Sequence, residues 1–266
     1  MGTGRRKRSR VIVLLLLLAG TILFLSGYDI LFAFQCMRLR QLGCNEAGKI
    51  ISGKTGMPVN GCEKFWVHRA DSYERLTRLS PYFPGLEADL VFDQQIKKFR
   101  VYHPPAPPGN LFADSYFQFI KTSGKKLWLD IKNIDSTEFN DAIRYFLESD
   151  TIYGLKQHVI IESSQINFVN RLAKLGFTVS YMASSWHLER KDLYETQAAG
   201  KLLPEVKFVS QEDIYVDRLK EIFPGKKIIT WAIAFKNYFD LSHYRTLLAD
   251  SSVAVVLINI KSSDYK

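Results

Sequence analysis

The amino-acid sequence predicts an α/β protein, a small (β/α)8 TIM barrel preceded by an N-terminal transmembrane helix. Short apolar runs alternate with helical segments from Lys64 onward, polar residues recur at the ends of successive runs, and an apolar stretch follows a basic leader. These features divide the 266 residues into a basic cytoplasmic leader at 1–10, a signal anchor at 11–34, a linker or stalk at 35–63 and a barrel at 64–266.

The apolar stretch is long enough to cross a bilayer. Residues 11–28 are almost wholly apolar and the run resumes at 30–34. About 20 residues at a helical rise of about 1.5 Å span a hydrocarbon core of about 30 Å. The basic leader belongs on the cytoplasmic side, which predicts a single-pass cell-membrane protein with an extracytoplasmic barrel. A cleaved signal peptide has the same layout and would make the protein secreted, but no small-x-small site follows, which favours an anchor.

Charge and cysteine content agree with export. The net charge is +9, and the leader supplies five of these charges, which leaves +4 for the rest of the chain. This excess does not indicate a nucleic-acid partner. Cys44 and Cys62 can close a short loop in an oxidising compartment, with Cys36 near the membrane. The odd cysteine count keeps three unpaired thiols as the alternative.

The barrel is predicted from its apolar runs and the helical segments between them. The runs lie at 64–67, 86–92, 99–102, 127–131, 158–161, 178–182, 207–209, 228–232 and 253–258. Helical segments include 111–122, 137–147, 166–175, 215–223 and 238–249, and Ser136 is the predicted N-cap of the second. If the third run extends the second, eight strands remain, and eight β/α units are typical of a closed parallel barrel.

Two pairs of charged residues, each spaced two residues apart, predict a metal site at the strand ends. Glu87 and Asp89 lie two residues apart on one predicted strand, so both carboxylates point to the same face. Asp130 and Lys132 repeat this spacing on the next barrel strand. Like charges at one place raise each other's pKa unless a cation compensates, which predicts Mg²⁺ or Ca²⁺. The alternatives are a solvated pair for the first pattern and a structural ion pair for the second.

Two histidines follow strands that end at the same place. His68 follows the first run and His103 the third, an arrangement that suits general acid and base groups at a phosphate. Arg69 can bind the phosphate, or it is an exposed surface residue, while Lys132 can neutralise a phosphate oxygen. Pro104 and the proline after it fix the chain direction beyond His103.

Two further strand-end residues are candidates. Glu162 closes the run at 158–161 and is predicted as a fourth metal ligand or a substrate contact. Trp231 lies in the run at 228–232 and is predicted to form an apolar wall for the substrate, with packing as the alternative. Tyr181, Ser210 and Asn259 have weaker claims.

The order of these motifs resembles the superfamily of phospholipase C-like phosphodiesterases, which includes glycerophosphodiester phosphodiesterases and sphingomyelinase D-like enzymes. The resemblance rests on His68-Arg69, the Glu87/Asp89 pair, His103, the Asp130/Lys132 pair and Trp231. It implies a (β/α)8 barrel, one divalent metal on the three carboxylates and catalysis by the two histidines. Ala70 replaces the glycine usual after His-Arg, and His103-Pro104-Pro105 with the short stretch to Asp130 is more similar to the menorin family.

The expected function is therefore a membrane-anchored, metal-dependent phosphoric diester hydrolase that acts on a phospholipid-derived or other phosphodiester. A non-catalytic, menorin-like, membrane-tethered interaction protein that keeps the barrel and its metal or phosphate pocket is the alternative. P-loop, G-x-S-x-G, G-x-G-x-x-G and Cys-x-x-Cys motifs are absent from the sequence, which argues against nucleotide hydrolysis, an α/β-hydrolase, a dinucleotide enzyme and structural zinc.

Overall fold

The computed structural model describes residues 44–45, 49–50, 62–231 and 241–259. The predicted basic leader, the predicted membrane anchor and most of the predicted stalk lie outside these ranges, and the side chains of the three cysteines are not among those described. Within the described ranges, none of the helices has the length and apolar character that a membrane span requires. The first two strands, β1 (Cys44–Asn45) and β2 (Lys49–Ile50), form a small antiparallel pair of their own.

Eight parallel strands close into a barrel, as the sequence predicts. In order around the ring they are β3 (Phe65–Val67), β4 (Gly85–Asp93), β6 (Lys126–Ile131), β7 (Val159–Ser163), β8 (Thr178–Met182), β9 (Phe208–Glu212), β10 (Lys227–Trp231) and β11 (Val253–Ile258). Pairing of β3 with both β11 and β4 completes the ring. The remaining strand, β5 (Lys98–Val101), pairs antiparallel with the second half of β4, so it extends that strand.

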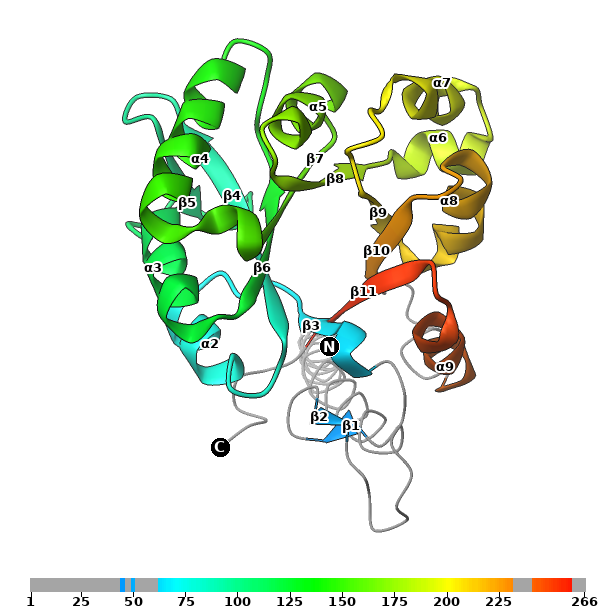
Figure 1. The fold of residues 1–266 in the computed structure, drawn as a ribbon, viewed down its shortest axis with the longest axis horizontal. Coiled ribbons are helices and arrows are strands. Elements are labelled where there is room, and N and C mark those ends of the chain that lie inside the picture. Colours follow the sequence, from blue (N-terminus) through cyan, green and yellow to red (C-terminus); the bar gives the residue numbers. More distant parts are fainter. Residues whose placement is uncertain (1–43, 46–48, 51–61, 232–240, 260–266) are drawn as a thin grey trace, which may run out of the picture.

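Helices cover the outside of the ring (Figure 1). They are α2 (Tyr73–Leu79), α3 (Ala113–Ser123), α4 (Phe139–Tyr153), α5 (Ile166–Lys174), α6 (Ser185–Arg190), α7 (Tyr194–Lys201), α8 (Val216–Ile222) and α9 (Leu241–Ala249), with short 3-10 turns η1 (Cys62–Lys64), η2 (Leu155–Gln157) and η3 (Asp213–Tyr215). The eight barrel strands are parallel, so all their carboxyl ends lie at the same end of the barrel. We call this end the barrel mouth.

The prediction that Ser136 is the N-cap of helix α4 is wrong. Helix α4 begins at Phe139 and is preceded by Glu138, which makes no side-chain cap bond. Instead, the backbone nitrogen of Thr137 donates to Oδ1 of Asp135 at 2.8 Å. The Asp135 carboxylate thus stabilises a turn before the helix, and because of this turn the helix begins later in the chain than predicted.

Inward-pointing side chains fill the barrel as a separate apolar layer. This interior cluster consists of Trp66, Trp128, Ile160, Ile229, Val255 and Leu257. The side chains on the opposite face of the same strands, such as Phe65, Val67 and Leu86, pack beneath the helices in the larger outer core. The two-residue period of the strands therefore assigns each residue to the interior or to the helix layer.

Gly85 gives the Trp66 ring its place inside the barrel. A Cβ atom at Gly85 would lie 2.3 to 2.5 Å from atoms of that ring. We expect Gly85→Ala to lower the free energy of unfolding by about 1–3 kcal/mol, because the ring has to shift within a packed interior. Thermal or urea unfolding measures this. Gly200→Ala is the matched control: it has nothing within 4 Å and lies in α7, so alanine there should stabilise by about 0.5–1 kcal/mol. Equal effects of the two changes would contradict the packing argument.

Candidate active site

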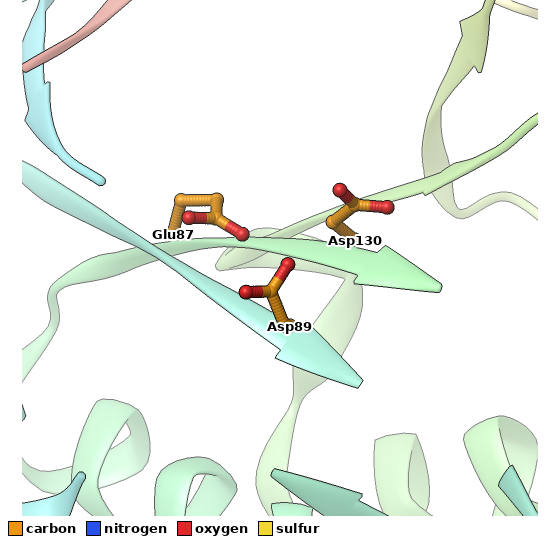
Figure 2. A group of neighbouring side chains, drawn as sticks. All are labelled: Glu87, Asp89 and Asp130. Atoms are coloured by element: carbon orange, nitrogen blue, oxygen red, sulfur yellow. The ribbon is translucent and has the colours of Figure 1, made fainter. Parts of the chain in front are cut away.

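Three buried carboxylates converge at the mouth. Glu87 and Asp89 both come from β4, and Asp130 comes from β6, where it lies in register with Asp89. The two-residue period turns all three to the interior, above Trp128. Figure 2 shows the carboxyl groups of Glu87, Asp89 and Asp130 grouped on one side of the neighbouring strands β4 and β6. One ligand oxygen from each lies within 4.8 Å of the others.

This group fits a hard divalent cation. Each carboxyl keeps one buried oxygen without a hydrogen-bond partner, namely Oε1 of Glu87, Oδ2 of Asp89 and Oδ1 of Asp130. Burial, followed by the neighbouring carboxylates, raises the pKa of Glu87 well above its usual value, and burial also raises the pKa of Asp130. Unpartnered buried carboxylate oxygens are costly, and Mg²⁺ or Ca²⁺ would satisfy them. Among the described residues the predicted ligands Glu87, Asp89 and Asp130 therefore form one set.

Lys132 supplies positive charge beside the carboxylates. Its backbone nitrogen donates to the carbonyl of Leu90 at 2.9 Å, which continues the pairing of β6 with β4. Its Nζ lies 2.6 Å from Oδ1 of Asp89 and also bonds to Oδ2 of Asp130. Burial opposes this charge, but the two carboxylates outweigh it and raise the pKa of Lys132. Lys132 is thus held as a cation at the edge of the carboxylate group.

Glu162 lies next to this group without joining it. On β7 it is in register with Asp130, and its side chain is fully buried. Neither carboxyl oxygen has a hydrogen-bond partner, although Ser180 and Ser210 lie close enough to lower its pKa slightly. Burial and then Asp130 raise that pKa well above its usual value, so the neutral acid is favoured. The structure does not bring Glu162 into the set of three ligand candidates.

His68 borders the carboxylates on one side. Its backbone nitrogen donates to the carbonyl of Ile258 at 2.9 Å, which extends the pairing of β3 with β11. The ring Nδ1 then lies 2.8 Å from Oδ1 of Asn259, an acceptor, so the proton is on Nδ1. The unprotonated Nε2 lies 3.8 Å from Oε2 of Glu87. Burial and the charge of Arg69 lower the pKa of His68 to about 4, which keeps the ring neutral at pH 7.

Arg69 connects the second histidine to the carboxylates. Its Nη2 donates to Nε2 of His103 at 2.9 Å, and its Nε lies 4.0 Å from Oδ2 of Asp89. Its backbone nitrogen donates to Oε2 of Glu87 at 2.6 Å, and its φ of 55° turns the chain sharply after β3. His103 is brought here because the nitrogen of Tyr102 bonds to the carbonyl of Asp89 at 3.1 Å. Half of the Arg69 side chain remains exposed, so its guanidinium can reach a ligand.

Trp231 joins the interior packing. Its ring centroid lies 6.0 Å from that of Trp128, and the side chain packs against the interior cluster while remaining partly exposed at the mouth. The Trp231 side chain therefore packs on the barrel interior and also lines the mouth at the end of β10.

The site includes two more residues, Asp71 and Asn259, which the sequence pattern did not single out as major candidates. Asp71 accepts a hydrogen bond from the backbone nitrogen of Asp89 at 2.9 Å, and burial and the Asp89 carboxylate raise the pKa of Asp71 to about 7. Asn259 orients His68, as described above. The sequence offered one signal for each residue: Asp71 lies close to His68-Arg69, and Asn259 lies close to the end of the last strand.

Comparison with known proteins supports the fold. No protein-family model and no curated protein matches the chain. Solved structures do match. A putative glycerophosphoryl diester phosphodiesterase from Silicibacter pomeroyi aligns with a TM-score of 0.55 and 11% identity over 75% of this chain and 91% of that chain. A glycerophosphodiester phosphodiesterase from Parabacteroides distasonis aligns with a TM-score of 0.55 and 14% identity over 76% and 94%.

A third solved structure contains a bound molecule. It is a phosphodiesterase from Oleispira antarctica in complex with the product sn-glycerol-3-phosphate, and it aligns with a TM-score of 0.50 and 12% identity over 73% of this chain and 92% of that chain. At these identities the likeness establishes that this chain has the TIM-barrel fold of those phosphodiesterases.

Proposed function

We propose that this chain is a metal-dependent phosphoric diester hydrolase, held at a membrane by its N-terminal segment, that acts on a phospholipid-derived or other phosphodiester. The observation that carries the proposal is the group of three buried carboxylates with unpartnered oxygens, bordered by two histidines. The phosphodiesterase structures that share the fold support it, and the product bound in one of them suggests glycerophosphodiesters as the first substrates to assay.

The cationic groups would hold the phosphate. A Mg²⁺ or Ca²⁺ ion on Glu87, Asp89 and Asp130 would supply positive charge against a non-bridging phosphate oxygen. Lys132, which already lies between two of these carboxylates, would face a second oxygen. The exposed guanidinium of Arg69 has parallel N–H donors suited to phosphate, and it would leave His103 when it binds the substrate.

The two histidines would move the proton. His68 is neutral and carries its proton on the nitrogen that faces Asn259, so Nε2 has a free lone pair and can accept a proton from the nucleophile. Nε2 of His103, which accepts from Arg69 in this structure, would take a proton from solvent once Arg69 turns to the phosphate, and would then pass it to the leaving alkoxide. The nucleophile is either water or a hydroxyl of the substrate, and the second choice would yield a cyclic phosphate.

The membrane part of the proposal rests on the sequence of residues 1–34. A basic leader followed by a long apolar run predicts an uncleaved anchor that places the barrel on the extracytoplasmic side. Carbonate extraction of membranes from cells that express the full chain, with protease protection, would test both the anchoring and the side.

The hydrolase proposal is tested with the purified full chain. It is assayed on glycerophosphodiesters, lysophospholipids and sphingomyelin with Mg²⁺ or Ca²⁺, beside Asp89→Ala and a chelator control. Metal-dependent release of an alcohol or a phosphomonoester that Asp89→Ala abolishes would support hydrolysis. Turnover that persists in Asp89→Ala would overturn the assignment of the site.

A non-catalytic menorin-like role has one observation in its favour. Between His103 and the start of β6 the structure has only the helix α3 and its connections, so no inserted domain is there to recognise a substrate. A chain that binds the metal with the three carboxylates and turns over none of these substrates would favour this second role.

Asn259 gives a test of how His68 is oriented. We expect Asn259→Ala to lower kcat by about 10- to 100-fold, in line with the loss of a group that orients a functional histidine. Metal affinity should change far less than kcat, because the hydrogen bond of Asn259 is made to His68, which is not one of the three carboxylates. Steady-state kinetics and metal titration measure the two quantities. An equal loss of both would indicate a general structural role instead.

A further inference from the structure

Large apolar side chains are exposed on the connections that follow β8 and β9. Trp186 is 60% exposed, Leu193 69%, Tyr194 49% and Ile214 47%, and we call these four residues the mouth patch. All four come after the carboxyl end of a barrel strand and before the main part of the returning helix, so they lie on the side of the mouth. Single exposed apolar residues are ordinary, but four on two adjacent connections are not.

The other exposed large apolar residues confirm that this distribution is uneven. Tyr73 and Ile96 also follow the carboxyl ends of strands. Only Ile152 and Leu175, at the ends of α4 and α5, lie toward the opposite end of the barrel. Among the described residues, exposed apolar side chains therefore gather on the face that also holds the candidate site.

Buried polar contacts fix the mouth patch to the barrel. Glu195 of α7 accepts a hydrogen bond from the backbone nitrogen of Ser184 at 2.8 Å and from the hydroxyl of Tyr181 on β8 at 3.2 Å. The hydroxyl of Tyr215 in η3 donates to Glu189 of α6 at 2.7 Å, which joins the two connections. The patch is thus a supported surface on the end of the barrel.

The chemistry of the mouth patch is that of a membrane interface. The guanidinium of Arg190 lies 4.5 Å above the ring of Trp186, and exposed Lys191 follows it. The ring of His187 stacks on Tyr194 at 4.0 Å and pairs with Asp192 at 2.7 Å. Tryptophan and tyrosine rings prefer the level of lipid headgroups, and arginine and lysine there bind anionic headgroups.

We propose that the mouth patch docks onto an anionic lipid bilayer, with Trp186 and Leu193 entering the headgroup region and Arg190 and Lys191 binding lipid phosphates. The proposal builds on the proposed anchor, because the tether would keep the barrel near the bilayer. Residues 35–61 reach at most about 90 Å when extended, whereas a domain of this size is about 45 Å across. The stalk is therefore long enough for the mouth to turn toward the membrane, where a lipid headgroup would meet the candidate site directly.

Tryptophan fluorescence tests this docking without any need for turnover. The four tryptophans of the chain all lie in the barrel: Trp66 and Trp128 are buried at 8% and 1% exposure, Trp231 is partly buried, and Trp186 is 60% exposed. The full chain is reconstituted into vesicles of phosphatidylcholine and phosphatidylserine, with either plain or brominated acyl chains. We expect brominated lipid to quench part of the wild-type emission, and Trp186→Phe, which keeps an apolar ring, to lose that quenching.

Leu193→Asp provides the second arm, with Ile152→Asp as its matched control at the opposite end of the barrel. Leu193→Asp should abolish the quenching while Trp186 is still present, and Ile152→Asp should leave it unchanged. Flotation with the vesicles reports the anchoring separately. Unquenched wild-type emission in a chain that floats would overturn the proposal, as would a chain that fails to float. A dimer in detergent that Leu193→Asp dissociates would overturn it in favour of a second copy as the occupant. Absence of hydrolase activity would leave the docking result standing.

Discussion

His68→Ala is expected to lower kcat by about 10²- to 10⁴-fold while metal binding and thermal stability stay close to wild type. The loss follows from the geometry: the unprotonated Nε2 of His68 lies 3.8 Å from Oε2 of Glu87, and Asn259 holds the proton on the other ring nitrogen. Because the pKa of His68 is lowered to about 4, the ring remains a competent base down to about that pH. The contribution of His68 to the acid limb of the kcat profile should therefore lie near pH 4.

His158→Ala is the matched control for His68. His158 precedes β7 at the end of the barrel opposite the mouth, and its Nδ1 lies 3.3 Å from the carbonyl of Lys125. Its removal should leave kcat unchanged. Steady-state kinetics on the best substrate of the panel, with isothermal titration of the metal, give both quantities. Equal activity of His68→Ala and wild type would remove His68 from the chemistry.

The sequence alone was enough for the barrel and for much of the candidate site. Strand residues alternate strictly, so a carboxylate pair two residues apart has to face one way, and Glu87 and Asp89 do. The third carboxylate follows because adjacent parallel strands bring Asp130 beside Asp89. The two-residue side-chain period of a strand and the succession of strands along the chain can both be read from the sequence.

Other parts of the site depend on contacts that a sequence pattern does not contain. Asp71 reaches the backbone of Asp89 from an irregular turn, and Asn259 reaches His68 because β11 happens to pair with β3. Helices α6 and α7 are short and carry exposed apolar residues, so they lack a clear amphipathic period. The stacking of His187 on Tyr194 and its pairing with Asp192 are likewise contacts that the sequence pattern does not contain.

Glu162 shows how far register reasoning extends. It ends a strand beside Asp130 and was therefore predicted as a fourth ligand or a substrate contact, and the pairing with Asp130 is as expected. The structure keeps its carboxyl outside the three-carboxylate group. Strand order places a residue next to its neighbour, but the tilt of strands around a barrel decides whether two side chains reach the same point.

Glu87→Gln is expected to abolish metal-dependent stabilisation while leaving the metal-free protein nearly as stable as wild type. Burial and the nearby carboxylates raise the pKa of Glu87, so its metal-free form is favoured as the neutral acid, and glutamine has the same shape. The amide oxygen can still accept the bond from the nitrogen of Arg69, which Oε2 of Glu87 accepts at 2.6 Å. What the amide loses is the negative charge that a divalent cation needs.

The matched control for this change is Glu162→Gln, which replaces a second fully buried acid whose pKa is raised in the same way. In wild type, metal at 100 times its Kd should raise the free energy of unfolding by about 2.7 kcal/mol. Glu162→Gln should retain that increment, whereas Glu87→Gln should lose it. The metal affinity of Glu87→Gln should be at least about 100-fold lower, because loss of a residue that only orients a metal ligand already costs about 10- to 100-fold. Thermal unfolding with and without Mg²⁺ or Ca²⁺ decides it. If Glu162→Gln loses the increment as well, four carboxylates hold the ion and the three-ligand site is incomplete.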